Sequence, residues 1–233
     1  VPDTTRIHYV ITHGGDAPNI VPDFAEVYYY VRSPDRDVVR DVWDRVTKAA
    51  QGAALGTGTT VDWEIIGGVH ELLSNEVLGK LLQHNLETVG GVTYTAEEKL
   101  FAAKIGVTLF GQPPSVETAK LVPAWDPRPV DAFGGSTDVG DISWVVPTMG
   151  FTTATWVPGT PGHSWQAVAA GGTTIGLKGM HVAAKTLALT AIDLFSQPDT
   201  IAAAKKEFEQ RRGADFHYKA LLGDRKPALN YRD

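Results

Sequence analysis

A proline-rich stretch in the middle of the chain most strongly limits how the chain can fold. Residues 111–132 contain five prolines and show no hydrophobic periodicity. Proline fixes its own φ angle and removes a backbone donor, so a long helix or a central strand is excluded here. We expect this stretch to connect two domains, one over residues 1–130 and one over residues 131–233.

The first part of the chain begins with strand-like alternation and continues with amphipathic helices. Residues 6–13 and 24–32 alternate apolar and polar side chains, which predicts an antiparallel pair of strands, and residues 59–66 predict a third strand. Helices are expected from Ser33 to about residue 51 and over residues 75–88, with Ser74 as a candidate N-cap. The order β-β-α-β-α favours an antiparallel sheet with two helices on one face, and a further strand could come from residues near Gly91.

The second part of the chain is richer in helices. Thr95 and Glu98 form a capping-box pattern, so a helix is expected over residues 96–110. After the proline-rich stretch, the sequence predicts a buried strand over 151–157, a helix rich in small residues over 173–195 and a charged helix over 199–212. One or two strands are too few for the sheet of an α/β domain, which favours a partner segment outside this chain.

Composition narrows the classes of function. The 233 residues carry a net charge of −6, so no basic surface points to nucleic acid or to an anionic membrane. No apolar run approaches the roughly 20 residues of a membrane span, and no signal-peptide pattern opens the chain, so we expect a cytoplasmic protein. The chain has no cysteine, and any metal ligands must therefore be histidines and carboxylates. The start at Val1 is compatible with a fragment, a processed product or a trimmed tag.

Two motifs come close to known catalytic patterns and fail. The sequence HELLS at residues 70–74 has Ser74 where a zinc-protease helix needs its second histidine. The sequence GGSTD at residues 134–138 has Asp138 where a serine nucleophile elbow needs glycine. Successive amides around Gly135, Ser136 and Thr137 can instead form a nest that binds a carboxylate, or they form an ordinary turn.

His163 is the most informative single residue. It lies in the loop GTPGHSWQ, residues 159–166, directly after the predicted strand. Loops at the carboxyl ends of buried strands are where α/β proteins place ligands. One imidazole cannot hold a catalytic zinc ion, which usually takes three protein ligands. From the residues alone, His163 is therefore either a structural histidine or one ligand of a larger site.

Three segments together resemble the aminoacylase-type family of dinuclear-zinc peptidases and amidohydrolases. They are GGDAPNIVPDFAEVYYYVR (residues 14–32), GGSTDVGDISWVVPTMGF (residues 134–151) and GTPGHSWQ (residues 159–166). Within this family the resemblance points to the p-aminobenzoyl-glutamate hydrolase branch. It implies an α+β lid, a ferredoxin-like four-stranded antiparallel sheet with two helices on one face. It also implies that residues 131–233 are the C-terminal part of an α/β catalytic domain.

The resemblance assigns roles to individual residues. His163 matches the last metal ligand, and Asn19 and Arg32 match lid residues that reach across a dimer toward the substrate. The loop containing Gly135, Ser136 and Thr137 matches a loop close to the substrate. The implied cofactor is zinc, two ions per complete site, and the implied substrate is an N-acyl amino acid or an aminobenzoyl-glutamate-like amide.

The resemblance also indicates what this chain lacks. The family's other metal ligands and its general base match nothing in these 233 residues, so we expect the C-terminal portion of an amidohydrolase, inactive by itself. It would act as a homodimer through the lid or together with the N-terminal half. Two alternatives remain open: a non-catalytic dimerisation subunit, and a serine hydrolase that uses Ser136 or Ser164 with His163.

Overall fold

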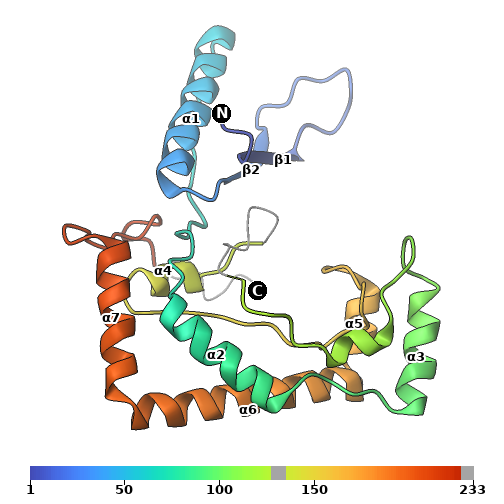
Figure 1. Cartoon of the computed structure of the whole chain (residues 1–233). Helices are drawn as coiled ribbons and strands as arrows, with labels where there is room; N and C mark the ends of the chain where they lie inside the picture. The colour runs from blue at the N-terminus through green and yellow to red at the C-terminus, as the bar shows by residue number, and fades with distance from the viewer. Residues whose placement is uncertain (127–134, 227–233) are drawn as a thin grey trace. The chain divides into compact units, whose positions relative to one another are not determined.

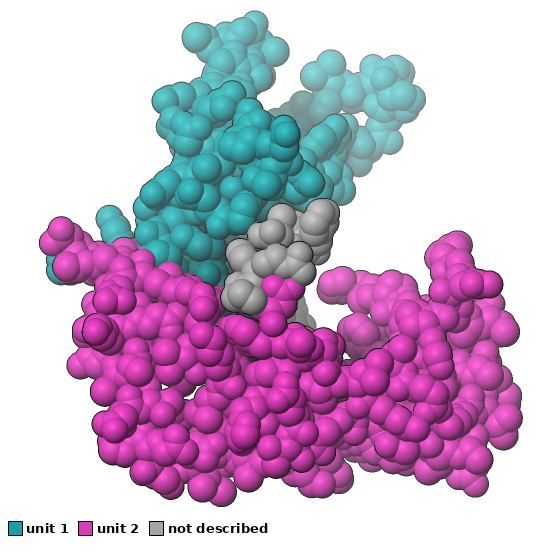
Figure 2. Space-filling model, viewed as in Figure 1, with its two compact units in different colours: residues 1–72, 128–145, 217–233 teal, residues 73–127, 146–216 magenta. Residues whose placement is uncertain are grey.

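A computed structural model describes residues 1–126 and 135–226, and its internal contacts divide the chain into two compact units (Figure 2). Unit 1 comprises residues 1–72, 128–145 and 217–233, and unit 2 comprises residues 73–127 and 146–216. Unit 1 contains β1 (Arg6–His13), β2 (Glu26–Arg32), α1 (Arg36–Thr57) and α4 (Val139–Ser143) (Figure 1). Unit 2 contains α2 (Glu76–Val89), α3 (Ala96–Gly106), the 3₁₀ helix η1 (Val116–Lys120), α5 (Trp165–Gly171), α6 (Thr174–Ser196) and α7 (Pro198–Arg212). The predicted domain boundary near residue 130 stays a prediction.

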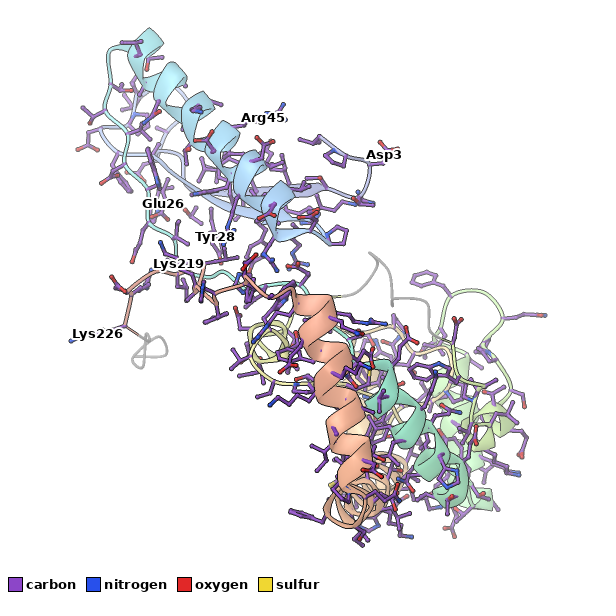
Figure 3. All side chains as sticks on the ribbon, turned by 60° about the vertical axis from the view of Figure 1, so that its left-hand side comes forward. Asp3, Glu26, Tyr28, Arg45, Lys219 and Lys226 are labelled. Carbon is purple, nitrogen blue, oxygen red and sulfur yellow. The ribbon has the colours of Figure 1, made fainter. Side chains whose placement is uncertain are left out.

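The two strands of unit 1 form an antiparallel ribbon. Tyr9 faces Tyr29 in the register, with ring centroids 5.7 Å apart, and such cross-strand aromatic pairs stabilise a ribbon. The register is irregular between Ile11 and His13, as at a β-bulge. Every residue of β1 is exposed, so the ribbon buries little of its own surface. Figure 3 labels two side chains of β2, Glu26 and Tyr28. The antiparallel pair of strands was predicted from the alternation of apolar and polar side chains.

The predicted four-stranded, ferredoxin-like lid is wrong. In the part of the chain that the structure describes, the sheet has two strands, β1 and β2. Residues 59–66 form no strand, although their side chains alternate as expected. Alternation favours extended backbone, but a strand also needs a neighbouring backbone to pair its N–H and C=O groups. The second predicted lid helix, α2, packs against α6 and α7 in unit 2 and not on the sheet.

The expected α/β character of the C-terminal part is also absent from the described residues. Residues 151–157 form no strand, and unit 2 shows one isolated bridge, between Ser74 and Thr148. The long helix α6 instead packs against the helices α2, α5 and α7. None of the helices in the described ranges is long and apolar enough to cross a membrane.

The boundaries of α1 show how local signals compete. Asp35 caps its N-terminus, accepting from the backbone N–H of Asp37 at 2.7 Å. The helix passes through Gly52, where it was expected to stop, because an interior glycine costs only about 1 kcal/mol and helix-forming residues follow it. It ends at Gly58, whose φ of 70° is the left-handed conformation that glycine adopts without strain. Val42, in the middle of α1, is buried, and α1 packs against β2.

The amino end of α2 depends on a carboxylate from α7. Asn75, and not Ser74, is the N-cap, accepting from the N–H of Leu78 at 3.0 Å. Glu207 on α7 accepts from the N–H of Glu76 at 2.8 Å and from that of Val77 at 2.9 Å. A carboxylate at this position pairs free helix donors and interacts favourably with the helix dipole. The contact holds the start of α2 against α7 in unit 2.

The core of unit 2 is an apolar cluster beside a buried carboxylate. The core contains Val92, Tyr94, Ala102, Ile105, Ala119, Val157, Ala170 and Ile175. The predicted capping box of α3 is confirmed, with Thr95 N–H donating to Glu98 Oε2 at 2.7 Å. Thr174 and Lys178, both on α6, also donate to the Glu98 carboxylate. Burial raises the pKa of Glu98, but the hydrogen bonds from Lys178, Thr174 and Thr95 outweigh it and hold the pKa at about 2.

The low pKa of Glu98 predicts acid sensitivity of unit 2. A carboxylate whose folded pKa lies below its ordinary value of 4.5 stabilises the fold above pH 4.5. That stabilisation is lost as the pH falls from 4.5 toward 2. We expect Glu98→Gln to lower the free energy of unfolding by about 1–3 kcal/mol at pH 7, with the difference from the unsubstituted chain vanishing in acid. Amide hydrogen exchange of α3 as a function of pH measures this, and Glu97→Gln, at an exposed neighbour, is the control. A difference that is constant from pH 7 to pH 2 would contradict the prediction.

Candidate functional site

His163 lies in a strained but well-anchored loop. Its φ of 58° makes it the one residue other than glycine with positive φ among those that the structure describes. This left-handed conformation costs a residue with a side chain about 1–2 kcal/mol. Ser164, the next residue, caps α5 by accepting from the N–H of Ala167 at 3.2 Å and donates to the carbonyl of Pro161 at 2.7 Å. Such strain persists where the surroundings enforce it, and it is frequent at functional sites.

The imidazole of His163 is exposed and borders an open cavity of about 470 Å³. The cavity is lined by Trp156, His163, Ser164, Trp165, Ala167 and Val168. Neither tryptophan was predicted from the sequence to belong to the site. The available signal was an indole on each side of the glycine- and proline-rich loop that carries the histidine.

The loop of Gly135, Ser136 and Thr137 lies in unit 1, and all three residues are exposed. It leads directly into α4, where Thr137 Oγ1 accepts from the N–H of Val139 at 3.3 Å. Gly134, at the start of the GGSTD motif, lies outside the described residues. The structure thus keeps the three residues together as one loop before a short helix.

Asn19 and Arg32 are both exposed, and the ribbon does not bring them together. Asn19 lies in a turn before β2, whereas Arg32 is the last residue of β2, at its other end. The guanidinium of Arg32 lies over the ring of Tyr30, 5.0 Å from its centroid. This cation–π contact leaves the donors of Arg32 able to bind a carboxylate.

A complete metal centre does not form within the described ranges. No group of three or more histidine, aspartate or glutamate side chains there is placed to hold a metal ion. The imidazole of His163 is exposed and could therefore supply one of the protein ligands of a zinc ion, the others coming from elsewhere. Residues 1–126 and 135–226 supply no second and third ligand beside it.

A buried polar cluster holds α4, and no motif in the sequence indicated it. His70 is almost fully buried, with its Nδ1 atom 3.0 Å from Oδ1 of Asp141. Tyr218 donates its hydroxyl to the same oxygen at 3.0 Å, and burial, followed by this bond, raises the pKa of Tyr218. A Cβ atom on Gly140 would lie 1.9 Å from the carbonyl oxygen of His70, so only glycine fits there. His70 belongs to the HELLS motif, but residues 67–73 form no helix.

A second set of contacts ties the same segments together. The indole of Trp144 donates to the carbonyl of Glu71 at 2.8 Å. Arg36 lies 3.7 Å from the Trp144 ring and pairs with the Glu71 carboxylate at 3.0 Å. These contacts fix α4 and the end of the loop that carries Thr137.

Comparison with known proteins identifies the class to which this chain belongs. No protein-family model matches the chain. It is 34% identical over 231 residues to a subunit of the p-aminobenzoyl-glutamate hydrolase of Escherichia coli (strain K12), covering 89% of this chain and 48% of that protein. It is 28% identical over 210 residues to Xaa-Arg dipeptidase of Homo sapiens, covering 88% of this chain and 40% of that protein. The protein of the same name from Mus musculus is also 28% identical, over 209 residues, covering 88% of this chain and 41% of that protein.

These similarities confirm the resemblance that the three sequence segments indicated. The chain belongs to the aminoacylase-type family of amidohydrolases and peptidases. Within that family it is similar to the hydrolase subunit just described and to the Xaa-Arg dipeptidases. It spans about half or less of the length of these curated relatives.

The positive φ of His163 predicts that glycine is more stable than alanine at this position, the reverse of the usual order inside a helix. We expect His163→Gly to be more stable than His163→Ala by about 1 kcal/mol, because glycine adopts positive φ without steric cost. Urea unfolding followed by tryptophan fluorescence measures the difference. The matched control is His181, an exposed histidine inside α6, where the glycine variant should be less stable than the alanine variant by about 1 kcal/mol. If the alanine variant were the more stable one at position 163 as well as at position 181, His163 would not be strained.

Proposed function

We propose that this chain is the C-terminal portion of a metal-dependent amidohydrolase that cleaves the amide bond of an N-acyl amino acid or an aminobenzoyl-glutamate-like substrate. The observation that carries the proposal is His163, the exposed and strained imidazole in the GTPGHSWQ loop. The backbone strain at His163 costs free energy, and the exposed side chain adds no packing to the core that could offset this cost. A role in binding is therefore favoured. Membership of the aminoacylase-type family supports the same interpretation.

In this proposal the chain's own residues bind and orient. His163 holds one metal ion, zinc being the expected metal, through its neutral imidazole. Arg32 offers a planar guanidinium and Asn19 an amide to the carboxylate and amide of the substrate. The amides around Gly135, Ser136 and Thr137 offer a second set of donors to a carboxylate. The two metal ions of the complete site would supply an activated water and stabilise the developing oxyanion.

The outer face of α6 supports a role as one portion of a larger catalytic domain. Leu177, Met180, Leu187 and Phe195 are all more than half exposed. At helical spacing Leu177 and Phe195 lie opposite the buried face of α6, which carries Ile175, Thr186 and Thr190, and Met180 and Leu187 lie on its flank. A helix that is apolar on both faces is typical of the layer between two other layers of structure.

The alternatives differ in what they require of named side chains. A serine hydrolase would need Ser164 or Ser136 as a nucleophile, but the Ser164 hydroxyl is engaged by Pro161 and Ala167. A non-catalytic dimerisation subunit would leave His163 without a ligand. A cytoplasmic location stays a prediction.

The metal role of His163 predicts a specific loss. In the complete enzyme, His163→Ala should lose about one metal equivalent per protomer and most amidohydrolase activity, because a ligand is removed. Metal analysis of the purified protein measures the first effect, and amide hydrolysis measures the second. His181→Ala removes an exposed histidine of α6 and is the control. The isolated chain should bind zinc weakly, since one imidazole does not replace three ligands. A His163→Ala enzyme with both metals and full activity would overturn the proposal.

The exposed ribbon of unit 1 predicts self-association. In the described structure β1 pairs with β2 alone, so its other edge presents unpaired backbone groups. We expect sedimentation equilibrium to show a dimer that Tyr9→Lys or Val10→Lys weakens, because charged side chains oppose edge pairing. Phe110→Lys places the same charge on a fully exposed residue of unit 2 and should leave the dimer intact. A strictly monomeric profile at high protein concentration would count against the dimer.

A further inference from the structure

The short helix α4 directly follows the loop of Gly135, Ser136 and Thr137 and needs contacts from elsewhere to hold its position. It has five residues, and Asp138 at its N-cap makes no side-chain hydrogen bond to it. A helix of this length is not stable by itself, because so few residues do not offset the cost of nucleation. The N–H of Gly140 donates to the carbonyl of Thr137 at 3.2 Å, so the loop and the helix are joined. Contacts that hold α4 therefore also hold the end of the loop.

Asp141 is the residue of α4 through which the hydroxyl of Tyr218 holds the helix. The Tyr218 hydroxyl donates to Oδ1 of Asp141 at 3.0 Å. The buried His70 Nδ1 atom approaches the same oxygen but is not aligned to form a hydrogen bond with it. Burial, and then the bond to Asp141, raises the pKa of Tyr218, so its hydroxyl keeps its proton and donates at neutral pH. A hydrogen bond to an ionised acceptor is stronger than one between neutral groups.

Residues 217–226, here called the strap, bring Tyr218 to this position. Figure 3 labels Lys219 and Lys226 of the strap. Three contacts join the strap to residues 64–70: the Tyr218 ring with that of His70, Leu221 with Gly68, and Arg225 with the Ile65 carbonyl and the Glu64 carboxylate. Residue numbers rise along the strap as they fall along its partner, so the two segments run antiparallel. The strap is thus attached at three points, and the Tyr218 end lies at α4.

We infer that Tyr218 is a positioning residue for the loop of Gly135, Ser136 and Thr137, acting through its hydrogen bond to Asp141. The strap holds Tyr218, Tyr218 holds Asp141, and Asp141 fixes α4 at the end of the loop. The binding of a substrate carboxylate by the amides of this loop rests on the proposed function. The dependence of the loop's end on Tyr218 does not.

Hydrogen exchange in the full 233-residue chain tests the inference without catalysis. Tyr218→Phe removes the hydroxyl and keeps the ring that contacts His70. We expect the amide of Gly140, which reports the bond to Thr137, to exchange roughly tenfold faster. Amides in the middle of α2, in unit 2, should exchange as before. The matched control is Tyr9→Phe, which removes the hydroxyl of an exposed tyrosine of β1 and should leave Gly140 unchanged. Unchanged exchange of Gly140 in Tyr218→Phe, or equal acceleration in α2, would overturn the inference.

A double-mutant cycle tests whether Tyr218 acts through Asp141. Asp141→Ala removes the acceptor and should also speed the exchange of Gly140. Because the bond is then already lost, adding Tyr218→Phe to Asp141→Ala should cause no further acceleration. An acceleration as large as in the unsubstituted chain would show that Tyr218 acts by another route and would overturn the inference.

Kinetics of the complete enzyme separate this inference from the proposed function. Tyr218→Phe should raise KM for N-benzoyl-glutamate about fivefold, with kcat and metal content nearly unchanged, because a displaced loop weakens substrate binding. A merely structural role would lower the amount of folded enzyme, which reduces the apparent kcat and leaves KM unchanged. An unchanged KM overturns the positioning role and leaves the metal role of His163 intact. Conversely, a His163→Ala enzyme that keeps both metals overturns the proposed function, while faster exchange of Gly140 in Tyr218→Phe still supports the dependence of the loop's end on Tyr218.

Discussion

The buried carboxylate of Glu98 is the contact on which the organisation of unit 2 depends. It closes the capping box of α3 and accepts from Thr174 and Lys178 of α6, which lie 76 and 80 residues further along the chain. Isolating a charge from water is expensive, and the contact is stable only because every donor is in place. Since α5 packs against α6, the loop that carries His163 is positioned by the same frame. The capping box of α3 thereby also helps to hold the helices that position the loop of His163.

Local signals in the sequence were sufficient wherever the structure is local. The box of Thr95 and Glu98, the two strands of the ribbon and the helices α6 and α7 all follow from patterns within a few residues. The N-cap of α2 was assigned one residue too early, to Ser74 and not to Asn75. Glu207, the carboxylate that completes that helix end, lies 131 residues beyond Glu76. Nothing near Ser74 in the sequence indicates it.

The sheet could not be predicted in the same way. Residues 59–66 carry the alternation of a strand, and residues 151–157 carry its β-branched and aromatic residues, yet neither segment finds a backbone to pair with in the described structure. Pairing is a property of two segments, whereas alternation is a property of one. The His70–Asp141 pair could not be predicted for the same reason. Its two residues lie far apart in the sequence, and only folding brings His70 Nδ1 to 3.0 Å from Asp141 Oδ1. The exposed residues of the candidate site were assigned from motifs, and their roles stay predictions.

The loop that carries His163 is held in place by atoms other than the imidazole of His163. Pro158 and Pro161 limit the conformations of the unfolded loop, which lowers the entropy lost on folding. The Ser164 hydroxyl bonds to Pro161 and to the first turn of α5, so the backbone on the carboxyl side is fixed by atoms other than the imidazole. The positive φ then turns the ring out of the chain path at a cost of about 1–2 kcal/mol. The backbone of this loop is thus held by its prolines and by Ser164, and the imidazole of His163 remains exposed.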